Sequence, residues 1–221
     1  RSFVQLPEWQ YSMTQRARPV RPPGRTAGRV GNQVAGPMDL GPDDTSCPPD
    51  YLGLTLDAFK RVVQRLPEDA VEQAYKIAYA DGPPAPDDTR LVGVEQPNGY
   101  VNQILFRAQE LGMSVCERMR RDGEPGVGRA TVFVSWFLGQ TLDDVLSGLE
   151  GFLERNKLDP ATTYFWICDY SFDLLAIAKG DPTKELPDRV REIGHTVLLL
   201  DPWHAPAPLK RIWCIWEVFA T

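Results

Sequence analysis

Three short apolar runs alternate with helical segments in the last ninety residues, and this alternation constrains the fold more than any other feature. The runs cover residues 131–136, 162–168 and 196–200. Residues 141–156 place apolar side chains every three or four positions, as on one face of a helix, and residues 187–194 form the tail of another. Continuous apolar strands separated by helices are typical of a parallel sheet covered on both faces. Residues 130–221 are therefore predicted to form a partial α/β domain with about three parallel strands.

A helical region is predicted before this domain, over residues 51–129. Thr55 can cap a helix over residues 56–66, and Pro67 can open a second helix over residues 67–78, so that the two form a helical hairpin. Residues 90–94 are a short extended piece. Residues 100–120 carry apolar side chains at helical spacing and predict one long helix that ends in cations.

The first 50 residues are rich in proline, glycine and arginine and show neither a helical nor a strand period. Six arginines against Glu8 give residues 1–36 a net charge of +5, which leaves −11 for the rest of the chain. Such a segment cannot build a core of its own. We expect an extended basic arm that lies on a partner or on its own domain. A processed transit peptide is the weaker interpretation, because the segment has little serine and no amphipathic period.

Composition excludes several classes of protein. A chain of net charge −6 does not have the global basic surface of a nucleic-acid-binding protein. No apolar run approaches the roughly 18 residues that a membrane span requires. The four cysteines have neither the close paired spacing of a zinc site nor that of a small secreted framework. No metal site is therefore predicted, and a reduced, intracellular protein is expected, in the cytoplasm or in an organelle such as a plastid or mitochondrion.

The segment 211–219 carries the most specific chemical pattern. Trp213 and Glu217 are four residues apart, so in a helix they share one face directly after the strand at 196–200. Ligands bind at the carboxyl ends of strands in open parallel sheets. Two interpretations are open: a ligand site with an aromatic wall, or a core tryptophan with an acid that complements the helix dipole.

These residues resemble Toll/interleukin-1 receptor (TIR) domains. The Val-Phe-Val-Ser segment at 132–135, followed by an amphipathic helix, is similar to the opening strand of plant-type members. The Trp-Cys-Ile-Trp-Glu segment at 213–217 is similar to the Trp-Cys-x-x-Glu pattern of their third helix. The resemblance covers about residues 130–221 and implies a flavodoxin-like parallel sheet, here truncated after the third helix. The sequence departs from the pattern at Trp136, where plant-type members have a basic residue.

The resemblance implies a site and a reaction. In TIR domains that cleave NAD, the glutamate of this pattern is catalytic, and it corresponds to Glu217. NAD would then be the substrate, and Ser135, Trp136, Asp169 and Trp213 would bind it. A carboxylate in this position can stabilise an oxocarbenium-like ribose.

Two hypotheses follow from different classes of function. The first, which we favour, is a non-catalytic interaction subunit of a larger assembly, without a cofactor. Its partners would be protein chains that contact residues 1–50 and the open edge of the sheet at Thr196, Val197, Leu198, Leu199 and Leu200, because an uncharged apolar edge needs a cover. It predicts that Glu217 is held by a local salt bridge or by a hydrogen bond at a helix end. The second, an NAD-cleaving or nucleotide-binding enzyme, predicts an open cleft at Ser135, Trp136, Asp169 and Glu217.

Overall fold

A computed structural model of the chain describes residues 40–41, 46–109, 112–173, 182–200, 204, 206–210, 214–215 and 217. Residues 36–221 belong to one compact unit. Most of the predicted arm, residues 1–39 and 42–45, lies outside the described residues.

Five short strands form one mixed sheet in the order β2-β1-β4-β3-β5. They are β1 (Leu52–Leu54), β2 (Val127–Arg129), β3 (Val132–Ser135), β4 (Phe165–Trp166) and β5 (Thr196–Leu198). The first predicted run, β3, pairs in parallel with β4 on one side and with β5 on the other. The α/β class and the three parallel strands are therefore confirmed. Among the described residues, β5 forms one edge of the sheet.

Two of the strands arise from the region that was predicted to be helical. β1 pairs antiparallel with both β2 and β4, so it extends the parallel strands on the side of β4. Each of the two new strands has three residues with a glycine in the middle. Strands this short cannot show the alternation that marks a strand in sequence. Residues 51–129 thus share one sheet with residues 130–221, and the largest apolar core contains residues of both regions.

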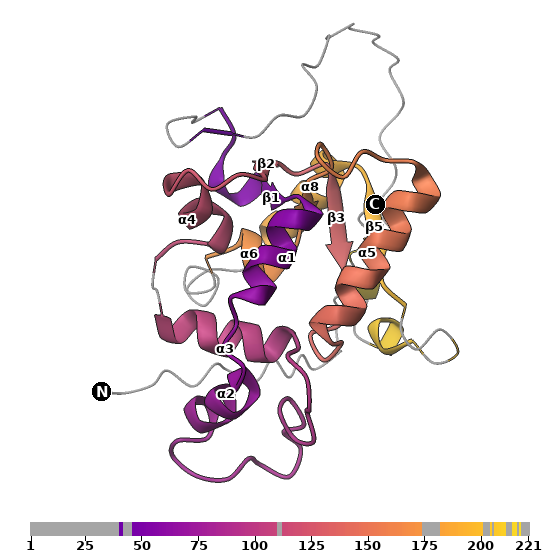
Figure 1. Cartoon of the computed structure of the whole chain (residues 1–221). Coiled ribbons are helices and arrows are strands. Elements are labelled where there is room, and N and C mark those ends of the chain that lie inside the picture. Colours follow the sequence, from indigo (N-terminus) through magenta and orange to yellow (C-terminus); the bar gives the residue numbers. More distant parts are fainter. Residues whose placement is uncertain are drawn as a thin grey trace, which may run out of the picture. The chain divides into compact units, whose positions relative to one another are not determined.

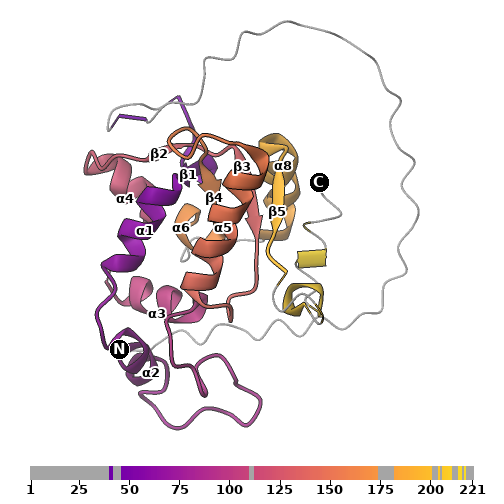
Figure 2. The same cartoon turned by 45° about the vertical axis from the view of Figure 1, so that its right-hand side comes forward.

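The helices cover both faces of the sheet (Figures 1 and 2). In chain order they are η1 (Pro49–Tyr51), α1 (Leu56–Gln64), α2 (Ala70–Ala78), α3 (Gly99–Gln109), α4 (Val115–Arg121), α5 (Leu142–Asn156), α6 (Cys168–Ser171), α8 (Pro182–Ile193) and η2 (Ala207–Lys210). Val134 packs in one core with Phe59 of α1 and Val145 of α5. The preceding residue, Phe133, packs on the opposite face with Val190 of α8. Successive side chains of β3 therefore reach opposite faces, which is why its first three residues are all apolar.

The predicted helix over residues 100–120 is two helices, α3 and α4. Ser114 begins α4 with a capping box: its hydroxyl accepts from the Glu117 backbone N–H at 3.1 Å, and the Glu117 carboxylate accepts from the Ser114 N–H at 2.8 Å. Gly112 has a φ of +98°, which glycine adopts most easily. A local cap and a glycine therefore override the continuous apolar spacing. The predicted hairpin also needs correction, because α2 packs chiefly against α3 rather than α1.

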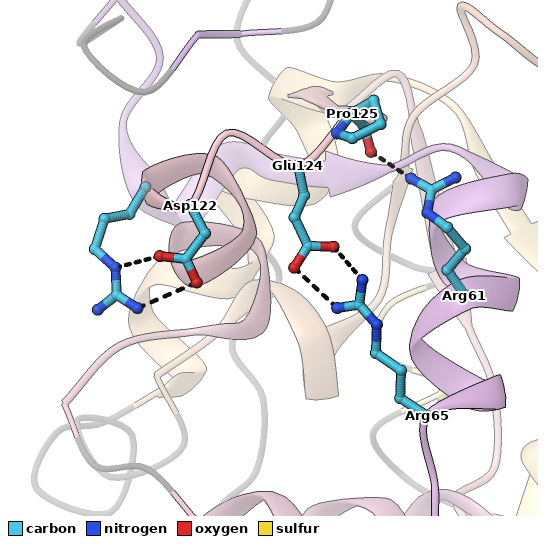
Figure 3. A network of polar contacts seen from close by, with 6 residues as sticks. Arg61, Arg65, Asp122, Glu124 and Pro125 are labelled. Atoms are coloured by element: carbon cyan, nitrogen blue, oxygen red, sulfur yellow. Dashed lines mark hydrogen bonds and ion pairs between the residues drawn. The ribbon is translucent and has the colours of Figure 1, made fainter.

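A polar network fastens the turn before β2 to α1 (Figure 3). Arg65, the residue that follows α1, binds Glu124 through two hydrogen bonds of 2.8 and 2.5 Å. Arg61, one turn earlier, donates to the carbonyl of Pro125 at 2.5 Å. The hydrogen bonds from Arg65 lower the pKa of the Glu124 carboxyl. The two arginines thus hold the chain at the point where it enters β2.

The last residues of the arm are tied to the sheet. The Leu40 N–H donates to the Val127 carbonyl at 2.8 Å. The Asp50 carboxylate pairs with the buried Arg189 of α8 at 2.6 Å, and the Asp50 carbonyl accepts from the indole N–H of Trp166 at 2.8 Å. This end of the arm is therefore part of the folded unit.

Within the described part of the chain, no helix combines the length and apolar character that crossing a bilayer demands.

An ion pair in the α2–α3 connection gives a pH-dependent prediction. Asp88 accepts three hydrogen bonds from Arg90, two of them from the guanidinium at 2.9 and 2.6 Å, and this lowers the Asp88 pKa to about 2. A lowered pKa in the folded state stabilises the protein at pH values above the ordinary carboxyl pKa. We expect Asp88→Asn to cost about 1 kcal/mol at pH 7. The difference from the parent should shrink as the pH falls from about 4 to about 2.

Urea unfolding of the two proteins across this pH range tests the prediction. The matched control is Asp87→Asn, which removes the neighbouring exposed carboxylate and should change stability little. A penalty for Asp88→Asn that is the same at pH 7 and pH 2 would contradict the assignment.

Candidate functional site at the carboxyl ends of the parallel strands

Glu217 lies at the carboxyl end of β3. Ser135, the last residue of β3, is 1% exposed, and its hydroxyl donates a hydrogen bond to the Glu217 carboxylate. Glu217 itself is partly exposed. Its backbone is helical, and so is the backbone of Cys214 and Ile215. The structure thus brings together two of the predicted site residues, which are 82 positions apart in the chain.

A second contact places the segment that carries Glu217. The thiol of Cys214 is buried and donates to the carbonyl of Trp136 at 3.5 Å. Trp136 follows β3 directly and is only 5% exposed. Trp213, the predicted aromatic wall of the site, lies outside the described residues.

Asp169 lies at the carboxyl end of the neighbouring parallel strand, β4, three residues after its last residue. It is the second residue of α6 and is fully buried. Its carboxylate accepts a hydrogen bond from the amide of Gln103 and another from the thiol of Cys168 at 3.4 Å. The neighbouring Tyr170 is also fully buried, and burial together with the Asp169 charge raises the pKa of its hydroxyl well above the ordinary value. A donor group from α3 therefore already meets the acid that was predicted to bind a ligand.

Helix α3 covers the carboxyl ends of β3 and β4. Figure 1 shows the β3 arrow pointing toward the side where α2 and α3 lie, and Figure 2 shows both helices on that same side. At its first residue, Gly99, the backbone N–H donates to the Leu138 carbonyl at 2.8 Å. A Cβ at Gly99 would lie 2.7 Å from the Trp136 ring, so only glycine allows this approach. One turn later, Gln103 reaches Asp169.

The loop after β3 is closed by its own polar contacts. The Gln140 amide oxygen accepts from the Phe137 N–H at 2.9 Å, and the Gln140 amide nitrogen donates to the Leu199 carbonyl at 3.4 Å. Gln140 is 7% exposed. It therefore links the loop after β3 to the end of β5 at the position where a ligand of an open parallel sheet would enter.

Three of the predicted site residues are buried, contrary to the open cleft that the enzyme hypothesis requires. Ser135, Trp136 and Asp169 expose 1%, 5% and 0% of their surface. Sequence reasoning missed Gln103, Gln140 and Gly99, which close the site. Asn98 gives a local signal for the start of α3, since its side chain accepts from the Val101 N–H at 2.9 Å, but a cap does not reveal where its helix docks.

Thiol chemistry finds little support near the site. Cys116 of α4 contacts the Ser171 hydroxyl of α6 at 3.8 Å, and burial raises the pKa of its thiol to about 12. A thiol with this pKa is not ionised at neutral pH and is a poor nucleophile. Among the described residues, no three His, Cys, Asp or Glu side chains lie where they could hold a metal ion.

No family model matches the chain, and no curated protein or solved structure matches it significantly.

Proposed function

We propose that this chain is a non-catalytic interaction subunit of a larger protein assembly, built on a TIR-like α/β module. The observation that carries this proposal is the position of α3. A helix of the same chain covers the strand ends at which ligands of open parallel sheets bind, and its Gln103 amide donates to the buried acid there. The Glu217 carboxylate accepts a hydrogen bond from the Ser135 hydroxyl, so this acid already has a partner within the chain, although a distant one rather than a local one.

The strand order supports the TIR-like relationship. The second predicted strand (β4), the first (β3) and the third (β5) lie side by side and parallel, which is the order that opens a flavodoxin-like sheet. The added strands β1 and β2 are a feature of this chain.

Two surfaces of the chain would contact partners. One is the basic arm. Its last residue, Asp50, contacts Arg189 and Trp166 of the folded unit, so an arm bound to a neighbouring chain would hold the folded unit close to that neighbour. The other surface is the β5 edge with the exposed Leu200, where a partner strand could pair. An intracellular assembly, in the cytoplasm or in an organelle, suits four cysteines that form no disulfide within the described part of the chain.

The arm can be tested by charge removal. Replacing its six arginines, Arg1, Arg16, Arg18, Arg21, Arg25 and Arg29, by glutamine should release the protein from its assembly, because it removes all the positive charge of the arm. Sedimentation of the native protein from its own cells should then shift from a large particle to a single free chain. The control replaces six exposed cations of the folded unit by glutamine: Lys76, Arg121, Arg155, Lys157, Arg191 and Lys210. Equal release by both variants, or a parent that already sediments as a single chain, contradicts the proposal.

The second candidate function is NAD cleavage, which is favoured by one contact, the Ser135 hydroxyl on the Glu217 carboxylate at the end of β3. Incubating the chain with NAD and measuring free nicotinamide separates the two functions. We expect no more release from the parent than from Glu217→Gln, which can keep a hydrogen bond to Ser135 but removes the charge. Release that the substitution abolishes would establish the enzyme and overturn the non-catalytic proposal.

A further inference from the structure

Helices α2 and α3 have an apolar core of their own. Ala70 and Ala74 of α2 pack against Val101 and Leu105 of α3, with Leu91 of the connecting loop in the same cluster. Its buried residues differ from those of the two cores that line the sheet, but Leu66 packs both against this cluster and against the core that α1 and α5 share. A pair of helices that buries its apolar surface mainly within itself can move as one body without breaking its own packing.

The face of α3 that meets the strand ends is largely polar. Gly99, Asn102 and Gln103 lie on one face, because residues three and four apart are neighbours on a helix. Gly99 contacts the Trp136 ring and Gln103 binds Asp169. Asn102 is 4% exposed, and its amide nitrogen donates no hydrogen bond to any described residue. A buried donor without an acceptor and a buried carboxylate beside a neutral amide both weaken the closed arrangement.

Two aromatic residues of α3 work against separation. The ring of Tyr100 meets the ring of Phe137 edge-on, at 6.4 Å between their centres. Phe106 belongs to the core that α1 and α5 share, and the Arg118 guanidinium lies 4.8 Å from the centre of its ring. The closed state is therefore held by a few apolar contacts, at Phe106, Tyr100 and Leu66, together with the contact between Gln103 and Asp169.

The connections of the two helices allow rotation. At the start of α3, the Leu142 N–H donates to the Pro97 carbonyl at 2.9 Å, and Asn98 forms a β-bridge with Thr141. Beyond the other end, Gly112 has a φ of +98°, and no atom of the described residues lies within 4 Å of the place where a side chain would begin. A tether at one end and an open glycine at the other define a hinge about which Gln103 can leave Asp169.

We propose that α2 and α3 form a lid that opens as one unit and uncovers Asp169 at the carboxyl end of β4. The proposed function rests on the closed state, which is the major one, and the lid does not depend on the partners proposed for the basic arm. It makes a carboxylate at the ligand-binding end of the sheet accessible from a minor state of the folded protein.

Amide hydrogen exchange of the intact chain tests the lid. Amides of α2 and α3 should share one protection factor, at least 100-fold below that of β3 and α5. Gln103→Ala removes the contact with Asp169 and should lower the protection of α2 and α3 together by about tenfold, while β3 and α5 keep theirs. Gln103→Glu should lower it further at pH 7 than at pH 5, because it sets a second carboxylate beside Asp169.

Two controls make the test specific. Gln73→Ala removes a 2.6 Å hydrogen bond to Asp69 within the lid itself, so it should leave the protection of α3 unchanged. Carbodiimide labelling of Asp169, read by mass spectrometry, should accelerate about tenfold in Gln103→Ala and not in Gln73→Ala. The lid would be overturned if the amides of α3 exchanged only together with those of β3. It would also be overturned if Gln103→Ala and Gln73→Ala changed the protection of α3 equally.

Discussion

Trp166→Ala is expected to destabilise the protein by about 4 kcal/mol. Trp166 lies in β4 at the centre of the sheet and is fully buried. Its ring stacks on Phe133 at 4.8 Å and meets Phe172 edge-on at 4.9 Å. Alanine would leave a cavity between β4, β3 and the residues after α6, and these neighbours belong to three separate elements that cannot all collapse into it.

Urea unfolding followed by far-ultraviolet circular dichroism measures this loss, since the signal does not depend on the tryptophan that is removed. Trp166→Phe is the matched control. It keeps an aromatic ring against Phe133 but loses the indole N–H that donates to Asp50 at 2.8 Å, so it should cost less than alanine does. A Trp166→Ala protein as stable as the parent would contradict the packing of this ring between β3 and Phe172.

Gly53→Ala is the second large effect, with an expected loss of about 3 kcal/mol. Gly53 is the middle residue of β1, and a Cβ there would lie 2.8 Å from the carbonyl oxygen of Phe165 and 3.2 Å from the Ala130 side chain. The first of these atoms belongs to the backbone of the neighbouring strand and cannot rotate away. Alanine should therefore force β1 away from β4 and weaken the junction between residues 51–129 and the parallel strands.

The control is Gly151→Ala in the middle of α5. A Cβ there would meet only the flexible end of Arg155, at 3.4 Å, and alanine favours the helix over glycine by up to about 1 kcal/mol. The two glycine substitutions should thus change the free energy of unfolding with opposite signs. Equal behaviour of the two variants in urea unfolding would show that β1 does not lie against β4.

The sequence predicted those elements that carry a strong local signal. Thr141 caps α5 by accepting from the Asp144 N–H at 3.1 Å, and the apolar stripe that follows it is the stripe that packs on the sheet. Thr55 caps α1 in the same way, accepting from the Ala58 N–H at 3.3 Å. Helix α1 begins directly after its predicted cap, whereas α5, predicted over residues 141–156, begins one residue later with Thr141 as the cap. A cap and an amphipathic period depend only on residues within a few turns, which is why both helices could be predicted.

Part of the candidate site could also be predicted from the sequence. Ser135 is the last residue of one predicted strand, and Glu217 lies in the segment that follows another. Parallel strands end at the same edge of the sheet, so the parallel topology brings the two residues to that edge, where they meet. The burial of Asp169 beneath α3 does not follow from any local pattern. Gln103 has no feature that distinguishes it from a solvent-exposed glutamine in an amphipathic helix.

By itself, the sequence determined the α/β class, the three parallel strands and the start of α1, since each depends on the spacing of apolar residues or on a cap within a few positions. Only the tertiary structure decided that β1 and β2 extend the sheet and that α3 closes its carboxyl end. The physical reason is that both arrangements depend on contacts between distant residues, Gly53 with Phe165 and Gln103 with Asp169, which leave no period in the chain.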